Sequence, residues 1–421
     1  MHIVYFSPRY YPAAGGAENH LAALAERFVQ DGHQVTVVTT DAHDFQLFWF
    51  PDKKRVAAEA VTSHNGVNIV RFPVRHLPFV PLAYHAWRRG LWLLSRLPLP
   101  FLTGVMARLS RRTPYVPELW RWVDEVELTA DVVIGMNICY EPFLWAGQRL
   151  ARRLGVPFVA QPLTHLGAGD VAGQDEMSGF YTMRHQKAVV LEADRAIVQT
   201  ETERDFYRDR GLAPENMVIS GPAIDLAEMN GDASSFKEKY QIEAPLVGYI
   251  GTHDFNKGTV HLIEAARLLW ARGVVFELGL AGVQTADFAH YWEQLPLNIQ
   301  DRIHLLGRLD EQDKQNFLAA MQLFVMTSRI DSFGIVFLEA WFHDTPVIGS
   351  TAWGMSDVIS DGEDGVLVPF GDVAQLANVI EHLITDHEEA IRLAANGHEK
   401  TIAYHDWSHK YQLVRQMVEG V

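Results

Sequence analysis

The feature that most constrains the fold is a regular alternation of short, β-branched apolar runs with helical stretches, repeated in both halves of the chain. In the first half the expected strands are His2–Ser7, Gln34–Thr40, Val67–Phe72, Asp131–Met136, Pro157–Gln161 and Arg195–Thr200. In the second half they are Leu246–Gly251, Phe276–Ala281, Ile303–Leu306, Leu323–Thr327, Pro346–Gly349 and Val366–Val368. Such alternation predicts an α/β fold with two doubly wound parallel sheets, each covered by helices on both faces. Ligands are then expected at the carboxyl ends of the strands.

The length of 421 residues exceeds what one compact core usually supports and favours two domains of about 200 residues each. The segment Asp225–Ala244 is polar, rich in turn-forming residues and poor in apolar ones, as expected of a join. We therefore predict a first domain at 1–230 and a second at 231–404. A last amphipathic helix at 405–421 is expected to pack back on the first domain.

Composition excludes several classes of function. The net charge of −16 argues against general nucleic-acid binding. A single cysteine, Cys139, cannot form an internal disulfide, which favours a reducing, cytoplasmic setting. The start of the chain is typical of a first strand and not of a signal peptide, and no apolar run of about 18 residues predicts a membrane span. No histidine or cysteine spacing is typical of a metal site, so no metal and no cofactor are expected.

Two carboxylates eight positions apart, Asp331 and Glu339, are the first candidate site residues. Glu339 is the only charged residue between Phe333 and Phe342, and a buried carboxylate is costly unless it receives hydrogen bonds. The donors could be the hydroxyls of a bound sugar, or a buried lysine or arginine in a structural ion pair. Asp331 could equally cap the helix that begins near Gly334.

Two glycine-containing turns follow the first strand of each half. Gly15-Gly16 opens a helix directly after strand one, where backbone N–H groups favour an anion; a turn with nothing bound is the alternative. In the second half, Lys257 precedes a helix predicted at Thr259–Trp270. A lysine there opposes the helix dipole, so we expect it to hold a phosphate, unless it is a solvated surface residue. His165, in a loop after a strand, is a weaker candidate because most such histidines are ordinary.

The segment 71–117 has no acidic residue but many arginines, interleaved with aromatic residues. The arginines are Arg71, Arg75, Arg88, Arg89, Arg96, Arg108, Arg111 and Arg112. Such a mixture suits an anionic membrane surface, where each basic residue adds about 1 kcal/mol. Ion pairs with the acidic remainder of the protein are the alternative.

Taken together, these features resemble the retaining glycosyltransferases of the GT-B fold, specifically glycosyltransferase family 4 (glycosyl transferases group 1). The resemblance covers nearly the whole chain and is strongest from Leu323 to Ile380, where several motifs follow the family's order. These are Asp331-x7-Glu339, Pro346-Val347-Ile348, Gly362-x-x-Gly365 and Leu376-Ala377. The resemblance implies two Rossmann-like domains facing a cleft, with a nucleotide-sugar held mainly by the C-terminal domain.

The resemblance also implies roles for single residues. Glu339 would bind the ribose hydroxyls, Asp331 the donor sugar and Lys257 the diphosphate. The implied binding residues are Gly15, Gly16, Thr252, Lys257, Arg308, Leu309, Ser332, Phe333, Gly334, Ile335 and Glu339, and the implied catalytic residues are His165, Lys257, Asp331 and Glu339. The chain departs from the family at Asp331, where glutamate is usual, and at Thr252, where the family has an arginine on the diphosphate. Arg329 is one candidate replacement for that missing cation.

The function that the resemblance implies is metal-independent transfer of a hexose from a UDP- or GDP-sugar to a hydroxyl acceptor, with retention of anomeric configuration. The acceptor would be a saccharide or a lipid-linked one, as in carbohydrate biosynthesis. The enzyme would be cytoplasmic, with the Arg-rich segment touching the inner face of a membrane. Alternatives are a catalytically silent nucleotide- or sugar-binding protein, and an epimerase or phosphorylase of similar architecture.

Overall fold

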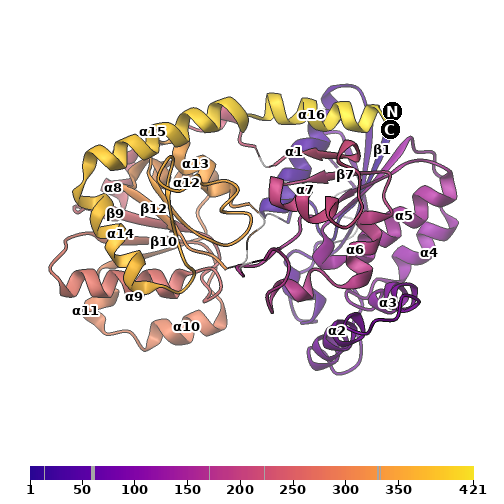
Figure 1. The fold of residues 1–421 in the computed structure, drawn as a ribbon, viewed down its shortest axis with the longest axis horizontal. Helices are drawn as coiled ribbons and strands as arrows, with labels where there is room; N and C mark the ends of the chain where they lie inside the picture. Colours follow the sequence, from indigo (N-terminus) through magenta and orange to yellow (C-terminus); the bar gives the residue numbers. More distant parts are fainter. Residues whose placement is uncertain (14, 58–61, 170, 222, 330, 332) are drawn as a thin grey trace. The chain divides into compact units, whose positions relative to one another are not determined.

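The computed structural model describes residues 1–421 except 14, 58–61, 170, 222, 330 and 332, and it forms two compact units, each with its own sheet (Figure 1). The first unit contains Met1–His165, Gly173–Ser220 and Tyr411–Val421. The second contains Leu166–Ala172 and Gly221–Lys410. The first unit thus ends at Ser220, ahead of the boundary predicted at 230, and the chain re-enters it near the C-terminus.

The first unit has an eight-stranded sheet in the order β3-β4-β2-β1-β5-β6-β7-β8, in which β3 alone pairs antiparallel. Its strands are β1 (His2–Phe6), β2 (Gln34–Thr40), β3 (Ser63–His64), β4 (Val67–Phe72), β5 (Val132–Met136), β6 (Phe158–Gln161), β7 (Arg195–Val198) and β8 (Met217–Ile219). The central strand β1 is buried along its length, with Tyr5 opposite Val37 on one side and Ile134 on the other. All six predicted strands are confirmed. The short β3 and β8 were not predicted, because so few residues show no periodicity.

The α-helices of the first unit follow these strands. They are α1 (Gly16–Gln30), α2 (Leu82–Ser95), α3 (Leu102–Ser110), α4 (Pro117–Glu125), α5 (Pro142–Leu154), α6 (Arg184–Leu191) and α7 (Glu201–Arg208). Helix α5 packs on β5, where Gly135 lies close to the backbone of Leu144. No α-helix among the described residues is long and apolar enough to cross a membrane.

The second unit has a six-stranded, entirely parallel sheet in the order β11-β10-β9-β12-β13-β14. Its strands are β9 (Leu246–Ile250), β10 (Glu277–Ala281), β11 (Ile303–Gly307), β12 (Leu323–Met326), β13 (Val347–Ser350) and β14 (Val366–Val368). These six predicted strands are also confirmed. Val247 of β9 lies opposite Leu278 of β10 and Leu323 of β12, so the first strand of this unit is central.

The helices of the second unit cover both faces of this sheet, and α9 packs beside α14 while α12 packs beside α8 and α13 (Figure 1). They are α8 (Ala233–Tyr240), α9 (Thr259–Ala271), α10 (Ala286–Glu293), α11 (Leu297–Gln300), α12 (Glu311–Ala320), α13 (Ile335–Phe342), α14 (Val373–Thr385) and α15 (His387–Tyr404). The two-sheet α/β class is as predicted.

The last helix, α16 (Trp407–Glu419), carries the chain from the second unit into the first. Within the first unit, the Tyr411 hydroxyl donates to Asp31 Oδ2 at 2.6 Å, and Arg415 lies 2.9 Å from the same carboxylate. These contacts fix the end of the chain on α1.

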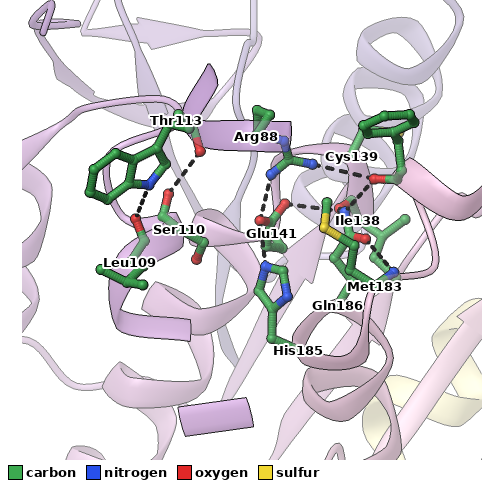
Figure 2. A network of polar contacts seen from close by, with 12 residues as sticks. Arg88, Leu109, Ser110, Thr113, Ile138, Cys139, Glu141, Met183, His185 and Gln186 are labelled. Atoms are coloured by element: carbon green, nitrogen blue, oxygen red, sulfur yellow. Dashed lines mark hydrogen bonds and ion pairs between the residues drawn. The ribbon is translucent and has the colours of Figure 1, made fainter. Parts of the chain in front are cut away.

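A buried polar network anchors the Arg-rich helix α2 to the first unit. The Glu141 carboxylate lies between Arg88 and His185, at 2.6 Å and 2.8 Å, and Glu141 and His185 are fully buried (Figure 2). Gln186 adds a hydrogen bond from its amide to the other Glu141 oxygen at 3.3 Å. Burial alone would raise the pKa of Glu141, but Arg88 and His185 outweigh it and hold that pKa below its usual value. Arg88 therefore belongs to the fold and not to a membrane-facing surface.

Candidate functional site

The strand order of the second unit marks one position at the sheet's carboxyl edge as special. From β9 the chain moves outward to β10 and β11, then returns to the other side of β9 to form β12. Ligands of doubly wound sheets bind outside the carboxyl ends of strands where the order reverses in this way. The loops after β9 and β12 are joined there, since the Arg329 amide donates to the Asn256 carbonyl at 2.7 Å.

Two helices begin at this edge behind left-handed glycines. Gly258 precedes α9 with φ of 82°, and Gly334 precedes α13 with φ of 86°. A Cβ on Gly258 would lie 2.5 Å from the Thr327 carbonyl oxygen, so only glycine lets the two loops approach so closely. Each helix start presents unpaired backbone N–H groups and the positive end of a dipole, which favour an anion.

Lys257 and Asp331 meet between these helix starts. Lys257 Nζ lies 3.0 Å from Asp331 Oδ2, and both side chains keep contact with solvent, at 32% and 20% exposure. Asp331 Oδ1 also accepts a hydrogen bond from the amide of Phe333, two residues ahead of α13, at 3.2 Å. An ammonium has three N–H donors, and Lys257 can therefore hold Asp331 and a ligand oxygen together.

Glu339 lies on the buried face of α13 and has a protein partner. Lys314 Nζ, from α12, lies 2.8 Å from Glu339 Oε1, and the exposure of the two side chains is 22% and 10%. Burial raises the pKa of Glu339, and the positive charge of Lys314 opposes that rise. Of the two alternatives for Glu339, the structural ion pair is present, so Glu339 does not need a ligand to satisfy its charge. Binding of ribose hydroxyls by Glu339 stays a prediction.

The other residues predicted for this site lie along the same edge. Thr252 is exposed after β9, and its carbonyl accepts a hydrogen bond from the Tyr249 hydroxyl at 2.8 Å. Arg308 is exposed and Leu309 half-buried after β11, an outer strand of the sheet. Backbone hydrogen bonds link Gly251 to Ala281 and Gly282 to Gly307, so the strand ends form one continuous rim.

Of the residues predicted around the start of α13, Phe333 is buried, and its ring lies 5.6 Å from that of His405. Ile335 is half-buried at the first position of the helix. Ser332 lies outside the described residues. Arg329, the candidate replacement for the family's arginine, has its guanidinium 5.9 Å from the Phe370 ring centre.

The remaining predicted residues belong to the first unit. Gly15 precedes α1 in an extended conformation, and Gly16 is its first residue. A buried ion pair, Arg9 with Glu18 at 3.0 Å, stands beside this turn, so the start of α1 already faces a carboxylate. His165 follows β6, half-buried, with its ring 5.0 Å from that of Tyr181.

Sequence reasoning missed Lys314 and Arg9, which pair with two buried carboxylates. Lys314 stands three and four positions before Phe317 and Leu318, both fully buried, and this helical spacing places it on the inner face of α12. That signal was available. No comparable signal marked Arg9. Among the described residues no group of three histidine, cysteine or acidic side chains is arranged to hold a metal ion.

Comparison with known proteins supplies the relatives of this chain. Residues 244–386 match the family profile described as "Glycosyl transferases group 1", and residues 15–222 match "Glycosyl transferase 4-like domain". The lipopolysaccharide core biosynthesis glycosyltransferase LpsE of Rhizobium meliloti is 35% identical over 50% of this chain and 59% of its own. The alpha-D-kanosaminyltransferase of Streptomyces kanamyceticus is 26% identical over 59% and 66%. The chain thus spans less than two thirds of the length of these curated relatives.

A solved structure shares the fold over the whole chain. Anabaena HepE, in complex with UDP and glucose, superposes with a TM-score of 0.71 at 18% identity, covering 100% of both chains. At that level of identity the likeness concerns the arrangement of helices and strands.

Proposed function

Because the chain belongs to the GT-B glycosyltransferases of family 4 (glycosyl transferases group 1), we propose that it transfers a hexosyl group from a nucleotide diphosphate sugar to a hydroxyl acceptor. The anomeric configuration is retained and no metal ion takes part. The observation that carries this proposal is the edge of the second unit's sheet, where Lys257 and the starts of α9 and α13 converge at the switch in strand order.

The chemistry at this edge is stabilisation of a leaving diphosphate. The bond from the sugar's anomeric carbon to the diphosphate breaks, a bond to the acceptor oxygen forms on the same face, and the acceptor's proton passes to the departing phosphate oxygen. Negative charge grows on that phosphate, where Lys257 and the N–H groups at the start of α13 meet it. Removing one preorganised donor of this kind commonly costs about 3–4 kcal/mol of transition-state stabilisation.

The donor sugar and ribose are assigned to the two carboxylates. Asp331, ordered by the Phe333 amide and Lys257, faces the developing positive charge of the sugar. Glu339 accepts ribose hydroxyls while it keeps Lys314 as its buried partner. UDP-glucose is the first donor to test, since HepE was crystallised with UDP and glucose. Gly16 and His165, in the first unit, are proposed to serve the acceptor side.

Donor turnover by the full chain is the direct test. UDP- and GDP-hexoses are supplied with and without EDTA, and release of the nucleoside diphosphate is followed. Lys257→Ala should lose nearly all turnover while keeping the wild-type unfolding temperature. Lys239→Ala is the matched control, because Lys239 is an exposed lysine of the same unit, paired with Asp313. Equal turnover in the wild type and Lys257→Ala would refute the site assignment.

A silent binding protein is the alternative from another class, and Thr252 favours it, because the family's diphosphate arginine is absent there. Such a protein would bind a nucleotide-sugar, seen as a raised unfolding temperature, yet release no diphosphate. NMR of any glycosylated product then reports whether the anomeric configuration is retained.

We also propose that the first unit touches an anionic membrane through residues 71–117. Of its arginines, Arg75 pairs with Glu118 and Arg88 with Glu141, so ion pairing explains part of the segment. The exposed apolar side chains of this segment include Phe79, Leu82, Leu93, Leu97, Leu99, Phe101 and Val105. Apolar residues beside arginines are the composition of an interfacial surface.

Flotation with phosphatidylglycerol vesicles tests this surface. The wild type should float and Phe79→Ser should float less, because Phe79 is 88% exposed. Phe255→Ser, which changes an exposed phenylalanine of the second unit, is the control. If the wild-type protein does not float with these vesicles at low salt, the membrane proposal is refuted.

A further inference from the structure

A second polar site lies in the first unit, away from the carboxyl ends of its strands. A pocket of about 520 Å³ opens between α3 and α5, at the C-terminal end of α6. Pockets of about 300–1,000 Å³ are typical of small-molecule sites. The charged side chains that line it are Arg108, Arg111, Arg149, Arg152 and Glu192.

The position of this pocket separates it from the proposed transfer site. Arg149 and Arg152 lie near the end of α5, and Glu192 directly follows α6. Both helices lead into strands of the sheet, β6 and β7, so these residues lie toward the strands' amino ends. Nucleotides of doubly wound domains bind at the opposite, carboxyl ends.

Positive charge in the pocket exceeds the negative charge that faces it. Arg149 pairs with Asp124 at 2.5 Å, and Arg152 pairs with Glu192 at 2.9 Å. Arg108 and Arg111, at the end of α3, have no carboxylate partner of this kind among the described residues. No ion pair or hydrogen bond joins Arg108 to any described residue. The guanidinium of Arg111 stacks 3.9 Å from the Trp120 ring centre.

The environment of Arg111 shows the same imbalance. Burial lowers the pKa of its guanidinium, and the like charges of Arg149 and Arg108 lower it further, against the opposing effect of Asp124. Arginines near a helix C-terminus favour the helix dipole, which accounts for Arg152. The same effect favours Arg108, in the last turn of α3, and Arg111, which caps that helix. The helix dipoles supply no acceptors for the guanidinium N–H groups, so they do not neutralise the four arginines that line one pocket.

Two buried N–H donors beside the pocket also lack acceptors among the described residues. The Trp145 indole N–H, from a residue that lines the pocket, is buried and has no hydrogen-bond partner among the described residues. The Nε–H of Arg111 is likewise buried and has no hydrogen-bond partner among the described residues. Buried donors without acceptors are uncommon and call for an explanation. An oxyanion placed in the pocket would accept from both and would balance the arginines.

We propose that this pocket binds a phosphate group, held by Arg108 and Arg111 on one side and by Arg149 and Trp145 on the other. Guanidinium forks match phosphate oxygens in pairs of hydrogen bonds. The phosphate is either a free small molecule or the headgroup of a lipid, since exposed Phe101 and Val105 of the α3 region lie next to the lining residues Thr103 and Gly104.

Calorimetric titration of the full chain with inorganic phosphate, and flotation with phosphatidylglycerol against phosphatidylcholine vesicles, test the proposal. For whichever probe binds the wild type, inorganic phosphate or vesicles, Arg108→Gln should weaken the affinity about tenfold, as expected for loss of one hydrogen bond to a charged group. This variant loses no partner in the folded protein. Arg204→Gln, on α7 and paired with Asp205, is the matched control and should bind like the wild type.

Glu192→Gln provides a readout that misfolding could not imitate. It frees Arg152 and removes the pocket's one lining carboxylate, so phosphate binding should become tighter. Sensitivity of phosphate titration to these variants identifies a free phosphate ligand, and sensitivity of vesicle binding alone identifies a lipid headgroup. If neither probe responds to Arg108→Gln or Glu192→Gln, the proposal is overturned.

Discussion

Replacement of Lys314 by methionine removes the buried ion pair beneath the proposed ribose site, together with the pair that Lys314 makes with Glu311, a largely exposed side chain. Methionine retains most of the apolar stem of lysine but removes the ammonium that lies 2.8 Å from Glu339. The Glu339 carboxylate would then remain inside the second unit without its ion-pair partner, because Glu339 as a residue is only 7% exposed.

The magnitude follows from the burial of the pair. Removing one member of a buried ion pair costs about 3–5 kcal/mol. Lys314 is 22% exposed, which places the pair toward the lower end, about 3 kcal/mol at neutral pH. For a unit of this size, that loss lowers the unfolding temperature by roughly 6–12 °C.

The loss should depend on pH. In the variant nothing opposes burial, so the pKa of Glu339 rises further above its ordinary value of 4.5. The folded state then binds a proton that the unfolded state releases, and stability falls as pH rises from 4.5 through the folded pKa. Unfolding by urea at pH 5 and pH 8 measures the difference, which should be larger at pH 8.

A double variant separates the charge from the packing. Lys314→Met with Glu339→Gln leaves no buried charge at this position, so the double variant should recover much of the stability lost in Lys314→Met. If Lys314→Met unfolds at the wild-type temperature at pH 8, Glu339 is satisfied by other means and the reasoning fails.

Other expectations concern the fold around the two sites. Glu141→Gln should destabilise the first unit at pH 7. The difference in unfolding free energy from the wild type should shrink as pH falls below 4.5, because Arg88 and His185 hold the pKa of Glu141 below that value and the stabilisation is lost when Glu141 is protonated. Urea unfolding at pH 7 and pH 4 measures this difference. Gly258→Ala should cost about 2 kcal/mol or more, from a left-handed backbone and a clash with Thr327. Gly273→Ala, which has φ of 88° but no atom within 4 Å of the added Cβ, should cost about 1 kcal/mol for the backbone alone. Equal losses in the two glycine variants would show that the close approach at Gly258 does not matter.

Local pattern was enough to identify the strands and the fold class. The runs around Val37 and Val247 could be predicted as buried strands because β-branched residues recur in them within a few positions. This local pattern can be recognised without knowledge of the rest of the chain. The two strands it missed, β3 and β8, pair at the ends of their sheet and are too short to show a period.

The candidate site was predicted in part. Lys257 and Asp331 were each placed at the end of a strand, and strands that follow one another around a doubly wound sheet bring such ends together. That they pair with each other depends on β9 lying beside β12, an order that the sequence does not state. The start of a helix near Gly334 was predicted from the sequence, whereas the left-handed backbone of Gly258 and Gly334 was found only in the structure.

The amino-acid sequence alone thus determined which segments form strands and helices, which class of fold they build, and which charged residues stand at strand ends. Only the tertiary structure decided how buried charges are satisfied. Glu339 and Lys314 are 25 positions apart, and Lys257 and Asp331 are 74 apart. Periodicity is a property of neighbours in the chain, whereas the energy of a buried charge depends on whichever group the fold brings within hydrogen-bonding distance.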